Sequence, residues 1–189
     1  MYNEFRNIIA ITNRSLCARP YLEQIKRVCS VHPAALVLRE KDLPAEEYQE
    51  LAGQVMKICA QYEVPCILHY YPEVAEELGN KNIHLPLWKL QGKHLLQWER
   101  LGCSIHSVEE AVEAERLGAT YLTAGHIYAT DCKKGIPPRG LNFLQEVCRH
   151  VQIPVYAIGG IELENRKQLS EVIMHGAAGA CIMSGMMRL

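Results

Sequence analysis

Short runs of β-branched and other apolar residues recur along this chain with helical segments between them, and this alternation limits the fold more than any other feature. Eight such runs stand at residues 7–12, 35–39, 65–69, 82–86, 103–106, 121–126, 154–159 and 180–184. Segments with helical periodicity lie between most of them, for example at 44–62, 107–117, 141–150 and 163–175. Eight strands that alternate with helices predict a (β/α)8 TIM barrel. A doubly wound sheet, which usually has fewer strands, is the alternative.

The stretch after the eighth predicted strand is unusually short. Only residues 185–189 remain there, so we expect one compact barrel domain over residues 1–189 that lacks most of its last helix. The missing helix would leave an apolar patch near the eighth and first strands. A homodimer is one way to bury such a patch.

Charge and composition exclude several classes of function. The formal net charge is −1, which gives no basic surface for nucleic acid, and no apolar run reaches the roughly 18 residues of a membrane span. The amino-terminal sequence lacks the pattern of a signal peptide, and none of the eight cysteines forms a CxxC pair. We therefore expect a cytoplasmic protein that binds neither nucleic acid nor membranes.

The most distinctive motif is GHIYATDCKKGIPPRG at residues 125–140. Its histidine, His126, ends the predicted strand 121–126, and TIM barrels build their active sites at the carboxyl ends of strands. A loop rich in basic residues follows, with Lys133 among them. An imidazole beside a cationic loop predicts a general acid/base that acts on an anionic substrate. A purely structural histidine is the alternative.

Glycine-containing turns after the last two strands predict a phosphate site. The seventh strand runs into Gly159-Gly160 and the eighth into Met183-Ser184-Gly185, and loops at these places in many barrels bind phosphate through backbone N–H groups. At the end of the second strand, Arg39 and Lys41 share one face at period two and are expected to meet an anion. The alternatives are turn glycines without a ligand and a solvated charge cluster.

Three further histidines, His69, His84 and His106, fall on the third, fourth and fifth predicted strands. Imidazoles are common metal ligands, but their spacing matches no recognised zinc pattern. We therefore predict no metal site. His84 is interpreted as part of the barrel wall, and His106, directly before the predicted helix cap Ser107, is equally compatible with a structural role.

These motifs together resemble the thiamine phosphate synthase/thiazole tautomerase superfamily over essentially the whole chain. LREKD (38–42), SIHSVEEAVEAERLGATYLTAGHIYATDCKKG (104–135), PVYAIGGI (154–161) and GAAGACIMSG (176–185) occur in the family's order. Residues 104–140 are most similar to the tautomerase branch, in which GH…TDCKKG…RG replaces the synthase's GP…PT.TK.

The resemblance implies an isomerase that converts an exocyclic carboxythiazole phosphate to the aromatic carboxythiazole ethyl phosphate of thiamine biosynthesis. His126 matches the tautomerase acid/base, and the reaction needs no metal or other cofactor. The substrate's phosphate and carboxylate would be bound by backbone N–H groups of Gly160, Met183 and Ser184 and by the cations Arg39, Lys41 and Lys133.

The chain departs from the synthase where that enzyme binds magnesium pyrophosphate. The synthase has an Asn-Asp pair after the third strand and an aspartate after the fourth, whereas this chain has Leu68-His69-Tyr70 and LPLWK at 85–89. Neither segment offers the carboxylate oxygens that Mg²⁺ prefers. Two alternatives stay open: a synthase that recruits Mg²⁺ differently, and a non-catalytic barrel that binds a phosphate ligand.

Overall fold

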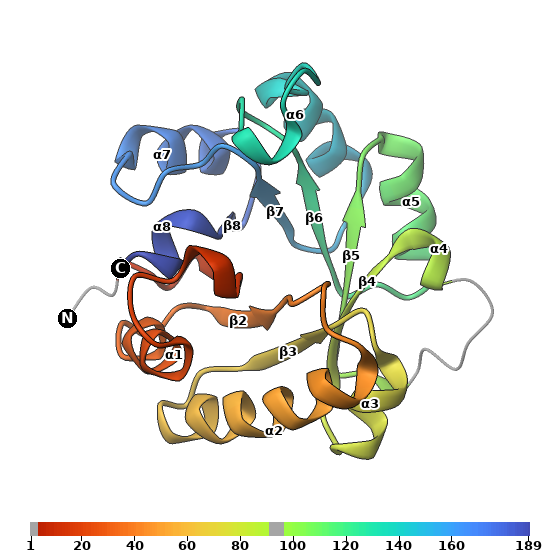
Figure 1. The fold of residues 1–189 in the computed structure, drawn as a ribbon. Coiled ribbons are helices and arrows are strands. Elements are labelled where there is room, and N and C mark those ends of the chain that lie inside the picture. Colours follow the sequence, from red (N-terminus) through yellow and green to blue (C-terminus); the bar gives the residue numbers. More distant parts are fainter. Residues whose placement is uncertain (1–3, 91–96) are drawn as a thin grey trace. The chain divides into compact units, whose positions relative to one another are not determined.

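The computed structural model describes residues 4–90 and 97–189, and in it eight parallel strands follow one another in sequence order as a closed barrel (Figure 1). The predicted TIM barrel is therefore confirmed. The strands are β1 (Ile8–Ile11), β2 (Ala35–Leu38), β3 (Cys66–His69), β4 (Asn82–Pro86), β5 (Arg100–Ile105), β6 (Tyr121–Gly125), β7 (Val155–Ile158) and β8 (Gly179–Ile182).

Helices alternate with these strands. They are α1 (Tyr21–Cys29), α2 (Ala45–Gln61), α3 (Pro72–Glu77), α4 (Leu87–Leu90), α5 (Val108–Arg116), α6 (Gly140–His150), α7 (Arg166–Met174) and α8 (Ser184–Met187), with short 3-10 turns η1 (Arg14–Leu16) and η3 (Asp131–Lys133). Ser107 caps α5, since its hydroxyl accepts a hydrogen bond from the Glu110 N–H at 3.1 Å. None of the helices in the two described ranges is both long and apolar enough to cross a membrane.

The strand register decides which residues can become neighbours. The chain forms two compact units, one reaching to His84 and including Ile182–Leu189, the other Leu85–Cys181. In the first unit Leu38 pairs with Leu68 and His69 with His84. In the second unit Ile105 of β5 pairs with Ala124 of β6, and Gly125 of β6 pairs with Ile158 of β7. Within each unit, residues that follow paired strands therefore emerge side by side.

The last helix is short, as expected, and its apolar side chains are buried within the first unit. Met186 and Met187 on α8 are fully buried, and the backbone carbonyl of Met186 accepts a 2.8 Å hydrogen bond from the buried Gln24 amide of α1. Among the described residues, the large apolar side chains that are exposed are Trp88, Val112, Ile136, Ile173 and Met174, and the last two lie at the end of α7, just before β8 in the chain. η1, α1 and the single turn of α8 pack together and bury the methionines, whereas the apolar patch near the eighth and first strands stays a prediction. The homodimer stays a prediction.

This packing predicts that the short α8 contributes strongly to stability. Met186→Ala should lower the free energy of unfolding by about 2–5 kcal/mol, because a fully buried side chain is lost. Met174→Ala is the matched control, since Met174 is 73% exposed at the end of α7 and its loss should change little. Urea unfolding of the two variants and the wild type measures the difference. Equal midpoints would show that α8 is not part of the cooperative core.

Candidate functional site

His126 directly follows β6, and its imidazole is only 4% exposed. Its Nε2 lies 3.2 Å from the backbone carbonyl oxygen of Ile136. Because a carbonyl only accepts hydrogen bonds, this contact assigns the ring proton to Nε2. Nδ1 is then the nitrogen with the lone pair, and it is buried without a hydrogen-bond partner among the described residues. The ring therefore has one nitrogen, Nδ1, that can still accept a proton.

The backbone on both sides of His126 is fixed by hydrogen bonds. The carbonyl of His126 accepts from the Arg139 N–H at 2.9 Å, and the Ile127 N–H donates to Ile158 at 2.9 Å. On the preceding side, the exposed His106 ring donates from Nδ1 to the Gly125 carbonyl at 2.9 Å. His106 thus contacts the backbone of the strand end directly before His126, and its role stays a prediction.

Two glycines after β7 let their loop approach the loop that carries His126. Gly159 and Gly160 have φ angles of +97° and +68°, which L residues rarely adopt. A Cβ atom on Gly159 would overlap the His126 side chain, and one on Gly160 would overlap the backbone carbonyl of Ala129. The glycine pair is therefore required for packing, which sequence reasoning did not anticipate. Because α7 begins only at Arg166, Gly160 is not at a helix start; its role in binding phosphate stays a prediction.

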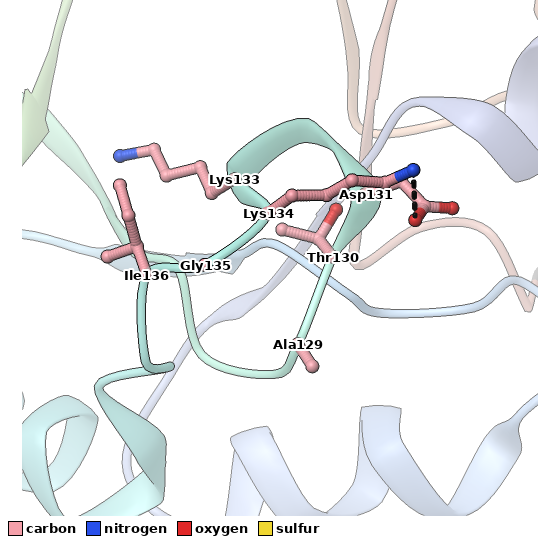
Figure 2. Close-up of a pocket in the computed structure, with 7 residues that line it drawn as sticks. All are labelled: Ala129, Thr130, Asp131, Lys133, Lys134, Gly135 and Ile136. Carbon is pink, nitrogen blue, oxygen red and sulfur yellow. Dashed lines mark ion pairs between the residues drawn. The ribbon is translucent and has the colours of Figure 1, made fainter.

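The basic loop after His126 lines a pocket of about 340 Å³ with residues Ala129, Thr130, Asp131, Lys133, Lys134, Gly135 and Ile136. Figure 2 shows Lys134 turned toward Asp131, with a nitrogen–oxygen distance of 3.6 Å, while the Lys133 side chain points away from that pair. Lys133 is exposed, and the notion that it binds a ligand anion rests on its charge alone. That role remains predicted.

In the first unit, a buried carboxylate organises the end of β2. Glu40 accepts hydrogen bonds from the Thr12 hydroxyl at 2.7 Å and the Tyr21 hydroxyl at 3.0 Å. Arg14 lies 3.3 Å from Glu40 and also pairs with Asp42. Burial, and next the charge of Glu40, raise the pKa of Tyr21 well above its usual value. The alternative of a solvated charge cluster is thus wrong for Glu40, which is 3% exposed.

Arg39 directly precedes Glu40 in the sequence, and it lies in one row with residues of the next two strands. The pairing of Leu38 with Leu68 places Arg39 next to His69, which pairs with His84. The two imidazole rings are stacked, with centroids 5.9 Å apart and an interplanar angle of 13°. Burial, then the positive charges of Arg39 and Lys41, lower the pKa of His84 to about 3. His84 is therefore neutral at pH 7.

The remaining predicted residues lie on α8 in the first unit. Met183 is the N-cap residue of α8 and makes no capping hydrogen bond through its side chain, and Ser184 is the first residue of the helix. The amide of Asn13 lies 4.0 Å from the Met183 sulfur. Within residues 4–90 and 97–189, no three His, Cys, Asp or Glu side chains converge as a metal site.

Comparison with known proteins identifies the family. The family model described as thiamine monophosphate synthase matches residues 8–186, so the chain belongs to this enzyme family of thiamine biosynthesis. It is 33% identical over 193 residues to the thiamine-phosphate synthase of Syntrophomonas wolfei, covering 99% of this chain and 91% of the relative. The thiamine-phosphate synthase of Pyrococcus horikoshii is 31% identical, with 98% and 89% covered.

A solved structure agrees with this assignment. The thiamine phosphate pyrophosphorylase of Pyrococcus furiosus superposes with a TM-score of 0.80 at 27% identity, covering 98% of this chain and 89% of that one. These relatives are named as synthases. They support the family and the synthase alternative, and they give no specific support to the tautomerase branch suggested by residues 104–140.

The buried His84 predicts a pH dependence of stability. Its folded pKa of about 3 lies below the ordinary 6.5, so the unfolded chain binds more protons in this window and stability is lost as the pH falls through it. Between pH 7 and 5 this group should cost about 2 kcal/mol of unfolding free energy. In His84→Asn this loss of unfolding free energy between pH 7 and 5 should be absent. In His32→Asn, at an exposed site, it should remain. Urea titrations at pH 7 and pH 5 measure the unfolding free energy of each protein. An equal loss between the two pH values in the wild type and in His84→Asn would contradict a buried neutral imidazole.

The close approach of the loop after β7 to the loop after β6 predicts that Gly160 cannot be replaced by a larger residue without loss of stability. Gly160→Ala should lower unfolding free energy by about 1–3 kcal/mol more than Gly135→Ala. Both glycines have positive φ, but a Cβ on Gly135 meets nothing within 4 Å, so the difference isolates the clash with the carbonyls after His126. Thermal or urea unfolding provides the measurement. Equal losses would mean that the loop after β6 gives way without cost.

Proposed function

We propose that this member of the thiamine monophosphate synthase family is a thiazole tautomerase, which converts the exocyclic carboxythiazole phosphate to the aromatic carboxythiazole ethyl phosphate. The observation that carries the proposal is the state of His126. Its Nε2–H is bound to the Ile136 carbonyl, and its Nδ1 is buried without a partner among the described residues. One positioned imidazole suffices for a proton shift.

The reaction moves one proton and leaves the atoms otherwise unchanged. Nδ1 of His126 removes a proton from the ring carbon, and the imidazolium returns it to the exocyclic carbon. The Ile136 carbonyl stabilises the cation formed in between, because hydrogen bonds to charged groups are stronger than those between neutral groups. Aromatisation drives the equilibrium, and general acid–base catalysis of this kind contributes about 10²–10⁴-fold in rate.

The substrate carries two anionic groups, and the proposed binding residues are of two kinds. Backbone N–H groups of Gly160, Met183 and Ser184 are proposed to bind the phosphate. Arg39, Lys41 and Lys133 supply positive charge for the carboxylate or the phosphate.

The alternative is a thiamine-phosphate synthase, and the names of the relatives favour it. That reaction couples a thiazole phosphate with a pyrimidine pyrophosphate and depends on Mg²⁺. His69, the last residue of β3, and His84, in the middle of β4, do not fit this ion, because they provide nitrogen atoms whereas Mg²⁺ prefers oxygen ligands. Glu40, the nearby buried carboxylate, is already bound by Thr12 and Tyr21. We therefore prefer the tautomerase.

The two functions differ in their measurable products. With the exocyclic carboxythiazole phosphate, the wild type should accelerate the ultraviolet change of aromatisation equally with and without Mg²⁺. His126→Ala should slow turnover by about 10²–10⁴-fold, because the proton carrier is lost. His150→Ala, at an exposed helix end, is the matched control and should match the wild type. Unchanged turnover in His126→Ala would contradict the mechanism, and Mg²⁺-dependent pyrophosphate release would establish the synthase.

A further inference from the structure

A single side chain of α7 holds the loop after β7, residues 159–165, at two places. The Gln168 amide donates from Nε2 to the Gly160 carbonyl at 3.1 Å, and its Oε1 accepts from the Glu162 N–H at 2.9 Å. Because a carbonyl only accepts and an N–H only donates, these contacts fix the orientation of the amide. Gln168 is half-buried in the first turn of α7, and its own N–H donates to the capping Asn165 side chain at 3.2 Å. The loop and the start of α7 are therefore joined by hydrogen bonds.

Two bound carbonyls of this loop direct the N–H groups that follow them. The Gly159 carbonyl accepts from the Tyr128 N–H at 3.0 Å, and the Gly160 carbonyl accepts from Gln168. Both peptide bonds are trans, so each carbonyl and the N–H after it point in opposite directions. The N–H groups of Gly160 and Ile161 are thus turned away from the loop after β6 and from α7. Within the described part of the chain, neither N–H has a hydrogen-bond partner.

We propose that Gln168 is a positioning residue for the ligand's phosphate: it holds the loop so that the N–H groups of Gly160 and Ile161 meet the phosphate oxygens. This role rests on the proposed function for the contact at Gly160, and it adds the side chain that orients this contact and a second donor. Ile161 is only 8% exposed, and an unpaired N–H at a buried residue is costly until an acceptor arrives.

The glycines explain why such a residue is needed. Gly159 and Gly160 give the loop its close approach to the loop after β6, but glycine has the largest conformational freedom of all residues. The hydrogen bonds of Gln168 restrict that freedom before the ligand binds, and a donor that is already ordered binds more tightly than one that must be ordered. Loss of Gln168 should therefore weaken the binding of the phosphate in particular.

Isothermal titration with carboxythiazole ethyl phosphate, and with the corresponding alcohol without the phosphate, tests this role. The wild type should bind the phosphorylated ligand more tightly. Gln168→Met keeps the length and helix propensity of the side chain but loses both hydrogen bonds. It should weaken binding of the phosphorylated ligand by about 10- to 100-fold, the usual loss for a hydrogen bond to a charged group, and leave the affinity for the alcohol unchanged. Gln54→Met, at an exposed site on α2, is the matched control and should bind both ligands as the wild type does.

Turnover gives a second readout that a merely structural role would not produce. Gln168→Met should raise KM with little change in kcat, because the acid/base His126 is retained. Equal wild-type affinities for the two ligands, wild-type phosphate affinity in Gln168→Met, or equal losses for both ligands would overturn the role of Gln168. A loss confined to the phosphorylated ligand, in a protein whose wild type does not catalyse the tautomerisation, would reject the tautomerase alone. Gln168→Ala, which also lacks both hydrogen bonds, keeps the test decisive if Gln168→Met fails to fold.

Discussion

The parallel strand register is the constraint on which the rest of this structure depends. Backbone hydrogen bonds fix which residue of one strand lies beside which residue of the next, and the side chains follow with a period of two. In one unit this places Arg39 beside His69 and His84; in the other it places His126 beside Gly159, since Gly125 pairs with Ile158. A slip of one residue would send each of these side chains to the opposite face.

The sequence allowed the barrel to be predicted because its information is local. Apolar runs such as 35–39 and 121–126 mark strands with little ambiguity, and Ser107 followed by two glutamates marks a helix start. The position of His126 could be predicted in the same way, because only the end of one strand had to be located. β5 begins earlier than predicted because its first residues, Arg100, Leu101 and Gly102, lack the apolar pattern of a strand.

Other features depend on contacts that no local pattern encodes. The carboxylate of Glu40 meets Thr12, Arg14 and Tyr21 from separate segments, so its burial could not be read from LREKD alone. The stacking of His69 on His84 requires knowledge of which strands pair. The free nitrogen of His126 depends on where the Ile136 carbonyl lies, which is a property of loop geometry. The burial of Met186 and Met187 was likewise not predictable, because chain length alone does not show that η1 and α1 pack against a single helical turn.

The way the first unit is assembled has a consequence for biosynthesis. Its core joins the segment that ends at His84 to residues 182–189, and the Gln24 amide and the Ala18 N–H bind the backbone carbonyls of Met186 and Met187. A chain emerging from the ribosome produces the partners of Met186 long before it produces Met186 itself. The second unit, Leu85–Cys181, is contiguous and has all of its residues earlier. The amino-terminal strands must therefore wait, with apolar surface incompletely covered, until translation has passed residue 187, and during that interval they are the part of the nascent chain most in need of chaperone protection.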